Sequence, residues 1–416
     1  MLCGVQAVLA QQSTNSVDTV SASSPLDTYL EISAENNPLL KSIFSQYLAA
    51  MERLPQAKAL PDPKVLFSIF ASPTETRVGP TTAGVGISQA FPWFGQLGEQ
   101  ENAMAQLAKS RFEIFEEERN KLFFNVRSTY YEFYVLEAAI RITNENIELL
   151  KSFRGLANVR LEAGTGSAVD LLRVEMDLAE LDNELKYLED TRKPVLAEFI
   201  ELLNTDSVFT IEIPDTLLTI DFEETKAVLL DSIMAQNPSL RKLDFEMGAL
   251  NSEIEVARKM GLPSFSLGVS YTNVGKRTDV PDFSGNGQDA FIFPQIGVQI
   301  PLYRKKYKAM VNEKELLKTS VVQQKEDKLN RLNTELEKGY RDYLDSQRRV
   351  ALYAYLTRLA NQSLDILLVE FTTMGKDFEE VLRMDRQKLT YELEIEKARA
   401  DQNTAVAFIT YLTGKK

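Results

Sequence analysis

The side chains that most often carry enzyme or metal chemistry are nearly absent from this chain. Of its 416 residues none is histidine, and Cys3 is the single cysteine. These counts exclude zinc, copper or iron sites built from His and Cys, His-based acid–base catalysis, a His-containing triad and a disulfide within the chain. The ten methionines are scattered, which favours core packing over metal ligation. We therefore expect no catalytic residue, no metal site and no cofactor, and we interpret the chain as a protein that is not an enzyme.

Carboxylates are the chemical groups that remain. The formal net charge is −13, which argues against nucleic acid and anionic membrane surfaces as partners. One carboxylate, Asp170, follows the glycine-containing segment 162–167, where two nearby glycines predict a tight helix–helix turn capped by Ser167. Asp170 then lies in the first turn of the returning helix, where the helix dipole stabilises a carboxylate that has no further role.

Two long stretches, 96–161 and 304–371, must position these turns. Neither contains proline, and glycine is rare in both, with Gly98 and Gly155 in the first and Gly339 in the second, so an unbroken helix roughly 100 Å long is expected in each. Their apolar residues recur at spacings of three, four or seven, which is typical of coiled-coil packing. The two apolar stripes consist of Phe112, Phe115, Leu122, Val126, Tyr130, Phe133 and Ile140, and of Leu329, Leu332, Leu336, Tyr340, Tyr343 and Val350.

Alternation with period two predicts strands on the N-terminal side of each long helix. Residues 64–72 and 83–94 form one expected hairpin, and residues 264–272 and 295–302 the other. In the second hairpin, one face carries large apolar residues and the opposite face small or polar ones. The first set is Phe265, Leu267, Val269 and Tyr271, and the second is Ser264, Ser266, Gly268, Ser270 and Thr272.

The N-terminal residues have a different character. Residues 1–10 are apolar and resemble the tail of a secretory signal peptide without its basic leader. Cys3 is better explained as part of that signal than as an acylated cysteine. Residues 11–24 are rich in Ser, Thr and Asn, so we expect a signal remnant and flexible N-terminus over 1–24. No later stretch approaches twenty apolar residues, so if the chain crosses a membrane it must do so with strands.

The chain repeats its own pattern. Asn37-Pro38 recurs as Asn237-Pro238, an N-cap followed by proline at the first helical position, and Tyr131 and Tyr134 recur as Tyr340 and Tyr343. We expect a first repeat over 25–204, with a hairpin at 64–94 and a tip turn at 162–167, and a connector over 205–222. A second repeat over 223–416 has its hairpin at 264–303 and its tip turn at 372–377. Each repeat reads helix, hairpin, long helix, turn, helix.

Four strands with one apolar face cannot close a barrel, and open sheet edges are not tolerated in lipid. Large outward residues opposite small ones are typical of outer-membrane strands, so closure requires further copies of the chain. Aromatic residues at the strand-to-helix junctions fit a belt at the membrane boundary, or alternatively a hydrophobic plug between sheet and helices. These are Phe91, Trp93, Phe94 and Tyr303.

The duplication, the Asn-Pro helix starts, the strand end Ser88–Gly95 and the turn around Gly164 and Asp170 resemble the TolC-type outer-membrane efflux proteins from about residue 25 onward. The Phe-Pro-Trp-Phe-Gly segment is most similar to the heavy-metal efflux branch typified by CusC and CzcC. The resemblance implies a mainly α-helical fold with a small β portion. It also implies a homotrimer in which a twelve-stranded transmembrane β-barrel, four strands per chain, continues into a twelve-helix α-barrel in the periplasm.

The resemblance further implies where the work is done. The family meets its periplasmic adaptor at the helix–helix turns, which correspond to Gly164, Thr165, Gly166 and Ser167, and to Met374, Gly375 and Lys376. Acidic residues beyond each turn narrow the closed tip, and the matching positions are Asp170 and, displaced by one residue, Glu380. A ring of such carboxylates would attract cations.

The function implied is the outer-membrane exit duct of a tripartite efflux pump. Its partners would be a periplasmic adaptor, an inner-membrane RND-type transporter and outer-membrane lipid, with no nucleic acid. The alternative is a periplasmic coiled-coil scaffold or adaptor-like protein whose hairpins form a soluble sheet. The sequence leaves open whether the exported compound is a metal ion, a drug or a detergent-like molecule.

Overall fold

The computed structural model describes residues 25–205, 211–222, 224–279, 285–374 and 378–415. The expected signal remnant over 1–24, Gly375 and Lys376 lie outside these residues. Within them the chain forms nine helices and five strands in this order: α1 (Pro25–Asn36), α2 (Pro38–Met51), α3 (Arg53–Lys58), β1 (Lys64–Ile69), β2 (Glu75–Thr76), β3 (Gly79–Phe91), α4 (Gln96–Glu162), α5 (Ala168–Leu203), α6 (Lys226–Gln236), α7 (Pro238–Met260), β4 (Ser264–Val274), β5 (Ala290–Gln299), α8 (Arg304–Met374) and α9 (Phe378–Thr413).

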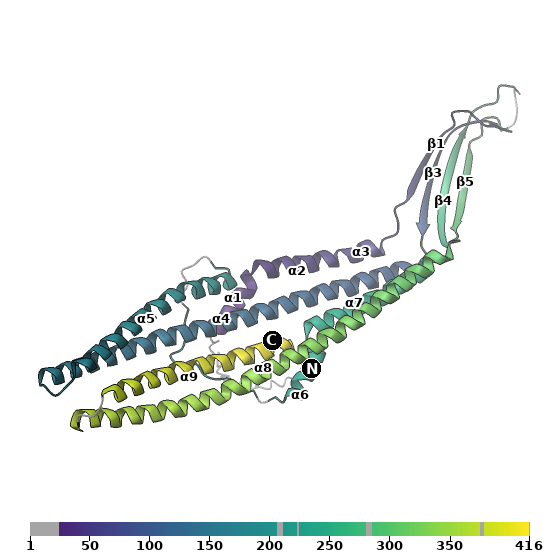
Figure 1. The fold of residues 1–416 in the computed structure, drawn as a ribbon. Coiled ribbons are helices and arrows are strands. Elements are labelled where there is room, and N and C mark those ends of the chain that lie inside the picture. The colour runs from purple at the N-terminus through teal and green to yellow at the C-terminus, as the bar shows by residue number, and fades with distance from the viewer. Residues whose placement is uncertain (1–24, 206–210, 223, 280–284, 375–377, 416) are drawn as a thin grey trace, which may run out of the picture.

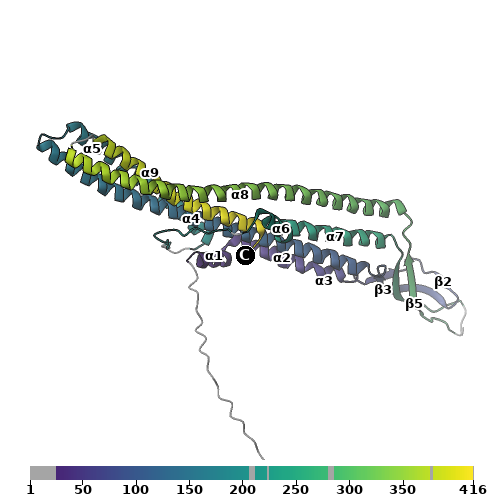
Figure 2. The same ribbon diagram turned by 90° about the horizontal axis from the view of Figure 1, so that it is seen from below.

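The molecule is elongated, with the sheet at one end and the α4–α5 turn at the other (Figure 1). Helices α4 and α8 contain 67 and 71 residues, so each is about 100 Å long at 1.5 Å per residue. They run most of the length of the helical body, and α5, α7 and α9 pack along them (Figures 1 and 2). The predicted helices over 96–161 and 304–371 are therefore present with nearly the expected bounds.

The Asn-Pro pairs start helices as predicted. The Asn37 side chain accepts a hydrogen bond from the Leu40 amide at 3.1 Å, and Asn237 accepts one from Leu240 at 3.3 Å. In both cases proline occupies the first helical position, where its missing N–H costs nothing. Asn237 is also buried and donates to the Leu412 carbonyl at 2.9 Å, so it connects α7 to the end of α9.

The strands form one antiparallel sheet in the order β1-β3-β4-β5, with the short β2 beside β3. The central pair joins the two halves of the chain, because Ile87 of β3 lies opposite Val269 of β4. Strands β1 and β5 are the two edges, and neither has a partner on its outer side in the described chain. At the loop end Gly79 has a φ of +132°, and a Cβ there would lie 1.8 Å from the Gly275 carbonyl oxygen, so only glycine fits.

Three apolar clusters hold the helices together. The first cluster joins α1, α4, α5 and the segment around Ile211 and Leu217. The second joins α4, α5, α8 and α9 near the tip, and the third joins the four helices α6, α7, α8 and α9. The predicted coiled-coil stripes supply part of these clusters. The buried members are Leu122, Val126, Tyr130 and Phe133 on α4, and Leu332, Leu336 and Tyr343 on α8.

Some boundaries differ from the sequence expectation. A break at Glu52 separates α2 from α3, because Pro55 has no N–H to donate to the Met51 carbonyl. Strand β5 ends at Gln299 rather than at Leu302, since Pro301 cannot continue the ladder. Strand β3 begins at Gly79 rather than at residue 83 and ends at Phe91 rather than at residue 94. The division into repeats at 205–222 stays a prediction.

Candidate functional site

The turn between α4 and α5 is a compact, exposed reversal. Arg160 closes it, because its carbonyl accepts hydrogen bonds from the amides of Thr165 and Gly166, both at 2.9 Å. Gly164 has a φ of +72°, and a Cβ on Gly166 would come within 3.0 Å of the Arg160 backbone, so both positions favour glycine. Ser167 caps α5 by accepting from the Val169 amide at 3.1 Å. Gly164, Thr165 and Ser167 are exposed. Of the second turn, only the end of α8 at Met374 is described.

The acidic residues beyond the turns are paired with arginines. Asp170, which is partly buried, lies 3.9 Å from Arg173 on the same helix. Arg173 also reaches across to Glu379 on α9 at 2.7 Å, so it links the α4–α5 hairpin to the α8–α9 hairpin. Glu380 forms an ion pair with Arg383 within α9. The structure thus places Asp170 and Glu380 at the same end of the molecule but brings Glu379, rather than Glu380, against the α5 arginine.

A second contact joins the hairpins from the other side. The Arg160 guanidinium donates to the Phe371 carbonyl at 2.5 Å and lies 4.2 Å from the centroid of the Phe371 ring. Phe371 in turn packs against Phe378 at 4.6 Å between ring centroids. The cation–π contact and the charge-assisted hydrogen bond together stabilise this pair more than either interaction would alone. The ends of α4 and α8 are therefore held together close to the tip.

Buried carboxylates lie a few turns above this contact. Asp385 on α9 is 1 % exposed, and both its oxygens are 3.3 Å from the Asn146 amide nitrogen on α4. Burial raises the pKa of Asp385 to about 6, and the hydrogen bond from Asn146 opposes that rise. Asp177 on α5 is 3.3 Å from Arg386, and burial raises its pKa while Arg386 lowers it. This level of the helical body therefore carries carboxylates that titrate above their ordinary range.

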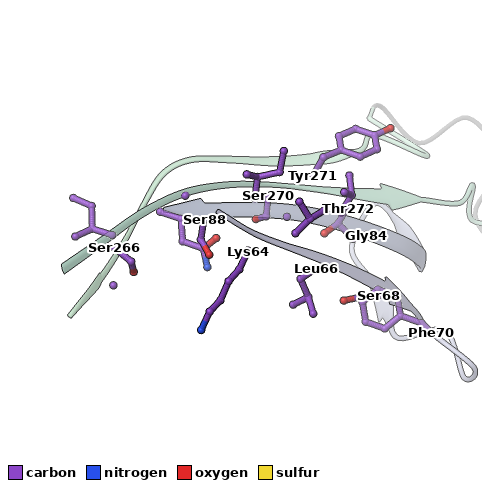
Figure 3. A pocket seen from close by; sticks show the side chains of 18 residues that line it. Lys64, Leu66, Ser68, Phe70, Gly84, Ser88, Ser266, Ser270, Tyr271 and Thr272 are labelled. Carbon is purple, nitrogen blue, oxygen red and sulfur yellow. The ribbon is translucent and has the colours of Figure 1, made fainter. Parts of the chain in front are cut away.

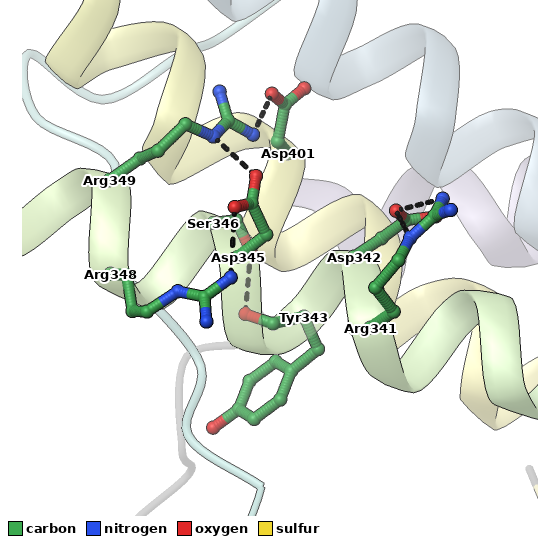
Figure 4. Close-up of polar contacts among 8 residues, drawn as sticks. All are labelled: Arg341, Asp342, Tyr343, Asp345, Ser346, Arg348, Arg349 and Asp401. Atoms are coloured by element: carbon green, nitrogen blue, oxygen red, sulfur yellow. Dashed lines mark hydrogen bonds and ion pairs between the residues drawn. The ribbon is translucent and has the colours of Figure 1, made fainter.

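A charged network joins α8 to α9 farther from the tip than Asp385 (Figure 4). Arg349 donates to Asp345 at 3.0 Å and to Asp401 at 2.7 Å, and Arg348 also binds Asp345 at 3.1 Å. The hydrogen bond from Arg348, followed by that from Arg349, lowers the pKa of Asp345. Asp345, Arg349 and Asp401 line a hollow with the ring of Phe124, but each carboxylate already has a cationic partner. The network therefore fastens two helices rather than presenting a free ligand set.

The two faces of the sheet differ sharply. One face forms a hollow lined mostly by small or polar side chains, with Leu66 and Phe70 as large apolar members and Lys64 as the one charged lining residue of the described chain (Figure 3). The opposite face carries large apolar side chains exposed to solvent, with Phe67 76 % and Ile296 70 % exposed. The small or polar members of the hollow are Ser68, Gly84, Gly86, Ser88, Ser266, Gly268, Ser270, Thr272, Gln295 and Gly297.

The junction aromatics divide between the two interpretations made from the sequence. Phe94 and Tyr303 are about 80 % exposed, at 79 % and 82 %, as a boundary belt requires. Trp93 is partly buried and stacks on Phe265 at 6.1 Å, as a plug between sheet and helices requires. Phe91 is 38 % exposed and lies opposite Phe265 in the sheet.

Comparison with solved structures identifies the architecture. A CusC structure that accompanies a study of transmembrane channel formation superposes with a TM-score of 0.78 at 14 % identity, covering 94 % of this chain and 92 % of CusC. This chain has the fold of the TolC-type outer-membrane channels. VceC of Vibrio cholerae shares this TolC-type fold with a TM-score of 0.74, 14 % identity and coverage of 94 % and 96 %. The similar scores do not single out the CusC-like branch.

Sequence relatives are more distant. The pyoverdine export outer membrane protein OpmQ of Pseudomonas putida is 21 % identical over 267 residues, which are 60 % of this chain and 57 % of OpmQ. The toxin and drug export protein A of Aggregatibacter actinomycetemcomitans is 22 % identical over 204 residues, 47 % of this chain and 43 % of that protein. The chain thus spans about half the length of these curated relatives. No protein-family model matches it.

In the described residues, no helix combines the length and apolar character needed to cross a membrane. Likewise, no group of three or more His, Cys, Asp or Glu side chains in the described ranges is arranged to hold a metal ion.

Sequence reasoning missed the contacts made by Arg173, Arg160 and Asp385. Asn146 and Asp385 are 239 residues apart, and nothing in either local sequence points to the other. The contact between Arg160 and Phe371 could have been anticipated from the internal repeat. If the two repeats lie side by side, the end of α4 lies beside the end of α8. The sequence contains no comparable signal for Arg173 and Glu379, because both look like ordinary solvated residues.

Proposed function

We propose that this protein is the outer-membrane exit duct of a tripartite efflux pump. Three copies would form a twelve-stranded barrel in the outer membrane that continues into a helical tunnel in the periplasm. Substrates would pass from an inner-membrane RND-type transporter and a periplasmic adaptor to the outside, without any covalent chemistry. The observation that carries this proposal is the sheet, which has an exposed apolar face, a mostly small or polar face, and two edges that have no partner strand in the described chain.

The sheet faces favour lipid over water. Ile69 is 87 % exposed and Phe67 and Ile296 exceed two thirds, on a face that no helix of the described chain covers. A contiguous apolar surface of this kind is costly in water and stabilising in hydrocarbon. The small residues opposite leave room for an aqueous lumen. A soluble periplasmic scaffold, the alternative function, would have no use for this arrangement.

The edges favour closure by identical copies. Strand β1 offers one unpaired edge and β5 the other, and these edges are different surfaces, so a head-to-tail contact forms a ring rather than a two-fold dimer. The helices repeat the asymmetry, because α5 and α8 each carry exposed apolar side chains. They include Leu172, Met176 and Tyr187 on α5, and Leu352, Tyr355 and Ile366 on the tip-side half of α8. Burying α8 of one copy against α5 of the next would remove both apolar sets from water.

The tip residues fit the adaptor and gate roles by position. We propose that Gly164, Thr165, Gly166 and Ser167 contact the adaptor, together with Met374, Gly375 and Lys376 of the second turn. The first set lies at the end of the molecule farthest from the sheet and is largely exposed. We propose that Asp170 and Glu380 contribute to a ring of carboxylates inside the tip.

Cross-linking tests the assembly directly. The double variant F67C/I296C places one cysteine on each edge strand, and Cys3 is the single native cysteine, so it is replaced by serine in every variant. Membranes treated with bismaleimides of increasing span should yield covalent dimers and trimers, whereas F67C alone and I296C alone should yield no trimers. Planar bilayers with the purified protein should show stable pores. A water-soluble monomer that gives neither trimers nor pores would refute the proposal.

A further inference from the structure

The start of α8 carries an unusual concentration of positive charge. Residues 304–308 read Arg-Lys-Lys-Tyr-Lys, four cations and no acid, in a chain whose net charge is −13. All four cationic side chains are exposed. None of them forms an ion pair with a carboxylate in the part of the chain that the structure describes. Arg304 donates to the Gly261 carbonyl at 2.9 Å, and Lys306 lies 5.6 Å from the ring centroid of the adjacent Tyr307.

This placement is unfavourable for the helix itself. The first turn of a helix carries partial positive charge, so it stabilises acidic side chains and is destabilised by cations. The first turn of α8 contains no acidic residue. The helix terminus therefore gives the three lysines no stabilising interaction of its own.

The internal repeat provides a built-in comparison. The equivalent start of α4 carries Glu99 in its first turn, and Lys259 of α7 neutralises it at 3.0 Å while also binding the Gly95 carbonyl at 3.2 Å. At that junction acid and base are balanced within one chain. At the α8 junction Lys305, Lys306 and Lys308 have no such acidic partner in the described chain, so the difference is specific to the second repeat.

The surroundings indicate what the partner is. Strand β5 presents an exposed apolar face, and the chain then passes through Leu302 and Tyr303, both more than three quarters exposed, directly into the lysines. An apolar strand, an exposed tyrosine and then a basic cluster is the order of surfaces met on leaving hydrocarbon for the headgroup layer. Tyr307 lies beside Gly261, the residue that follows α7, so Lys305, two positions earlier and about 200° away around the helix, lies on the side of α8 away from α7.

We propose that Lys305, Lys306 and Lys308 form a binding surface for the phosphate groups of anionic glycerophospholipids in the membrane leaflet next to the helical body. The inference rests on the proposed function, since it requires the sheet to lie in a bilayer. It adds a lipid preference that the channel activity alone does not require. It also refines the conclusion drawn from net charge, because this local cluster attracts the anionic surface that the whole chain repels.

Lipid binding to the purified full-length protein tests the proposal. Wild type, K305Q/K306Q/K308Q and a matched control, K41Q/K186Q/K338Q, are compared in one nonionic detergent. The control removes the same charge from exposed lysines on α2, α5 and α8 away from the junction. Bound dioleoylphosphatidylglycerol and dioleoylphosphatidylcholine are counted by native mass spectrometry at low and high ammonium acetate.

Wild type and control should prefer phosphatidylglycerol, by up to about 100-fold at low salt if each lysine contributes fully, and the preference should shrink as salt rises. The triple variant should lose this preference while keeping its oligomeric state and pore formation. Arg304 is left intact because it holds the Gly261 carbonyl.

Three results would overturn the proposal. An unchanged phosphatidylglycerol preference in the triple variant, with pores intact, refutes this inference and leaves the proposed function standing. Loss of the oligomer with lipid preference intact shows instead that the lysines bind acidic groups of a neighbouring copy. A wild-type protein that forms no pores and retains neither lipid refutes the proposed function and this inference with it.

Discussion

The buried carboxyl of Asp385 provides a quantitative test of how the helices pack near the tip. Its ordinary pKa is 3.8 and burial raises it to about 6. A difference of about 2 pKa units corresponds to about 3 kcal/mol of destabilisation per chain once the carboxyl is ionised. Because the folded chain holds this proton more tightly than the unfolded chain, stability contributed by the site is highest below pH 4. It falls as pH rises through 4 to 6, and the full cost is present above pH 6.

Replacing Asp385 with Asn removes the charge and keeps the shape. The new amide oxygen can still accept from Asn146, which is 3.3 Å from the present carboxylate oxygens. D385N should therefore be more stable than wild type at pH 7.5, by up to about 3 kcal/mol, and equal to it near pH 4. The neighbouring charges, Asp177 with Arg386 and Glu392 with Lys388, are unchanged in the variant.

The assay is unfolding of the detergent-solubilised protein at half-unit steps between pH 4 and 8, followed by circular dichroism. The informative quantity is the difference between D385N and wild type at each pH, since carboxylates distant from Asp385 contribute equally to both. D182N, at an exposed aspartate of α5, serves as the matched control and should give a flat difference. A flat difference for D385N as well, or one that decreases with rising pH, would show that Asp385 is not buried as described.

Three further outcomes follow from the contacts. N237A should lower the free energy of unfolding by about 2 to 3 kcal/mol and N37A by about 1 kcal/mol, because the buried Asn237 also donates to the Leu412 carbonyl. The denaturation midpoints of the two variants measure this difference, and equal losses of stability would contradict it. R160A should speed hydrogen exchange at the end of α8 more than R160K does, since lysine keeps the charge but loses the planar stacking on the ring; identical exchange would exclude that stacking. The double variant D170A/E380A should raise single-channel conductance or reduce cation preference in planar bilayers, and unchanged channels would remove both residues from the gate.

The sequence predicts the elements of this fold well because they obey local rules. The absence of proline over 96–161 fixes one long helix, and Asn37-Pro38 and Asn237-Pro238 fix helix starts, since cap and first turn lie within four residues. The strand faces follow from period-two alternation. The details that the sequence pattern missed are also local. Pro55 separates α2 from α3 at Glu52 and Pro301 shortens β5, in both cases because proline has no backbone N–H to donate, which the hydrophobic pattern does not reveal.

The candidate site is less accessible to sequence because it depends on which helix faces meet. Asp170 and Glu380 are found by their position after a turn, but the link from Arg173 to Glu379 depends on how two hairpins lie side by side. Arg349 similarly reaches Asp401 of a different helix, 52 residues away. Such pairs are set by crossing geometry rather than by spacing. The basic run at 304–308 is visible in the sequence, but its meaning emerges only beside the exposed face of β5.

The two unlike edges of the sheet have a genetic consequence. If copies close into a ring as proposed, a copy whose β5 edge is damaged still presents an intact β1 edge, so it would join healthy copies and then prevent the ring from sealing. Edge lesions should therefore behave as dominant mutations when expressed beside the normal gene. Lesions that prevent the chain from folding at all should be recessive, because such copies never enter an assembly.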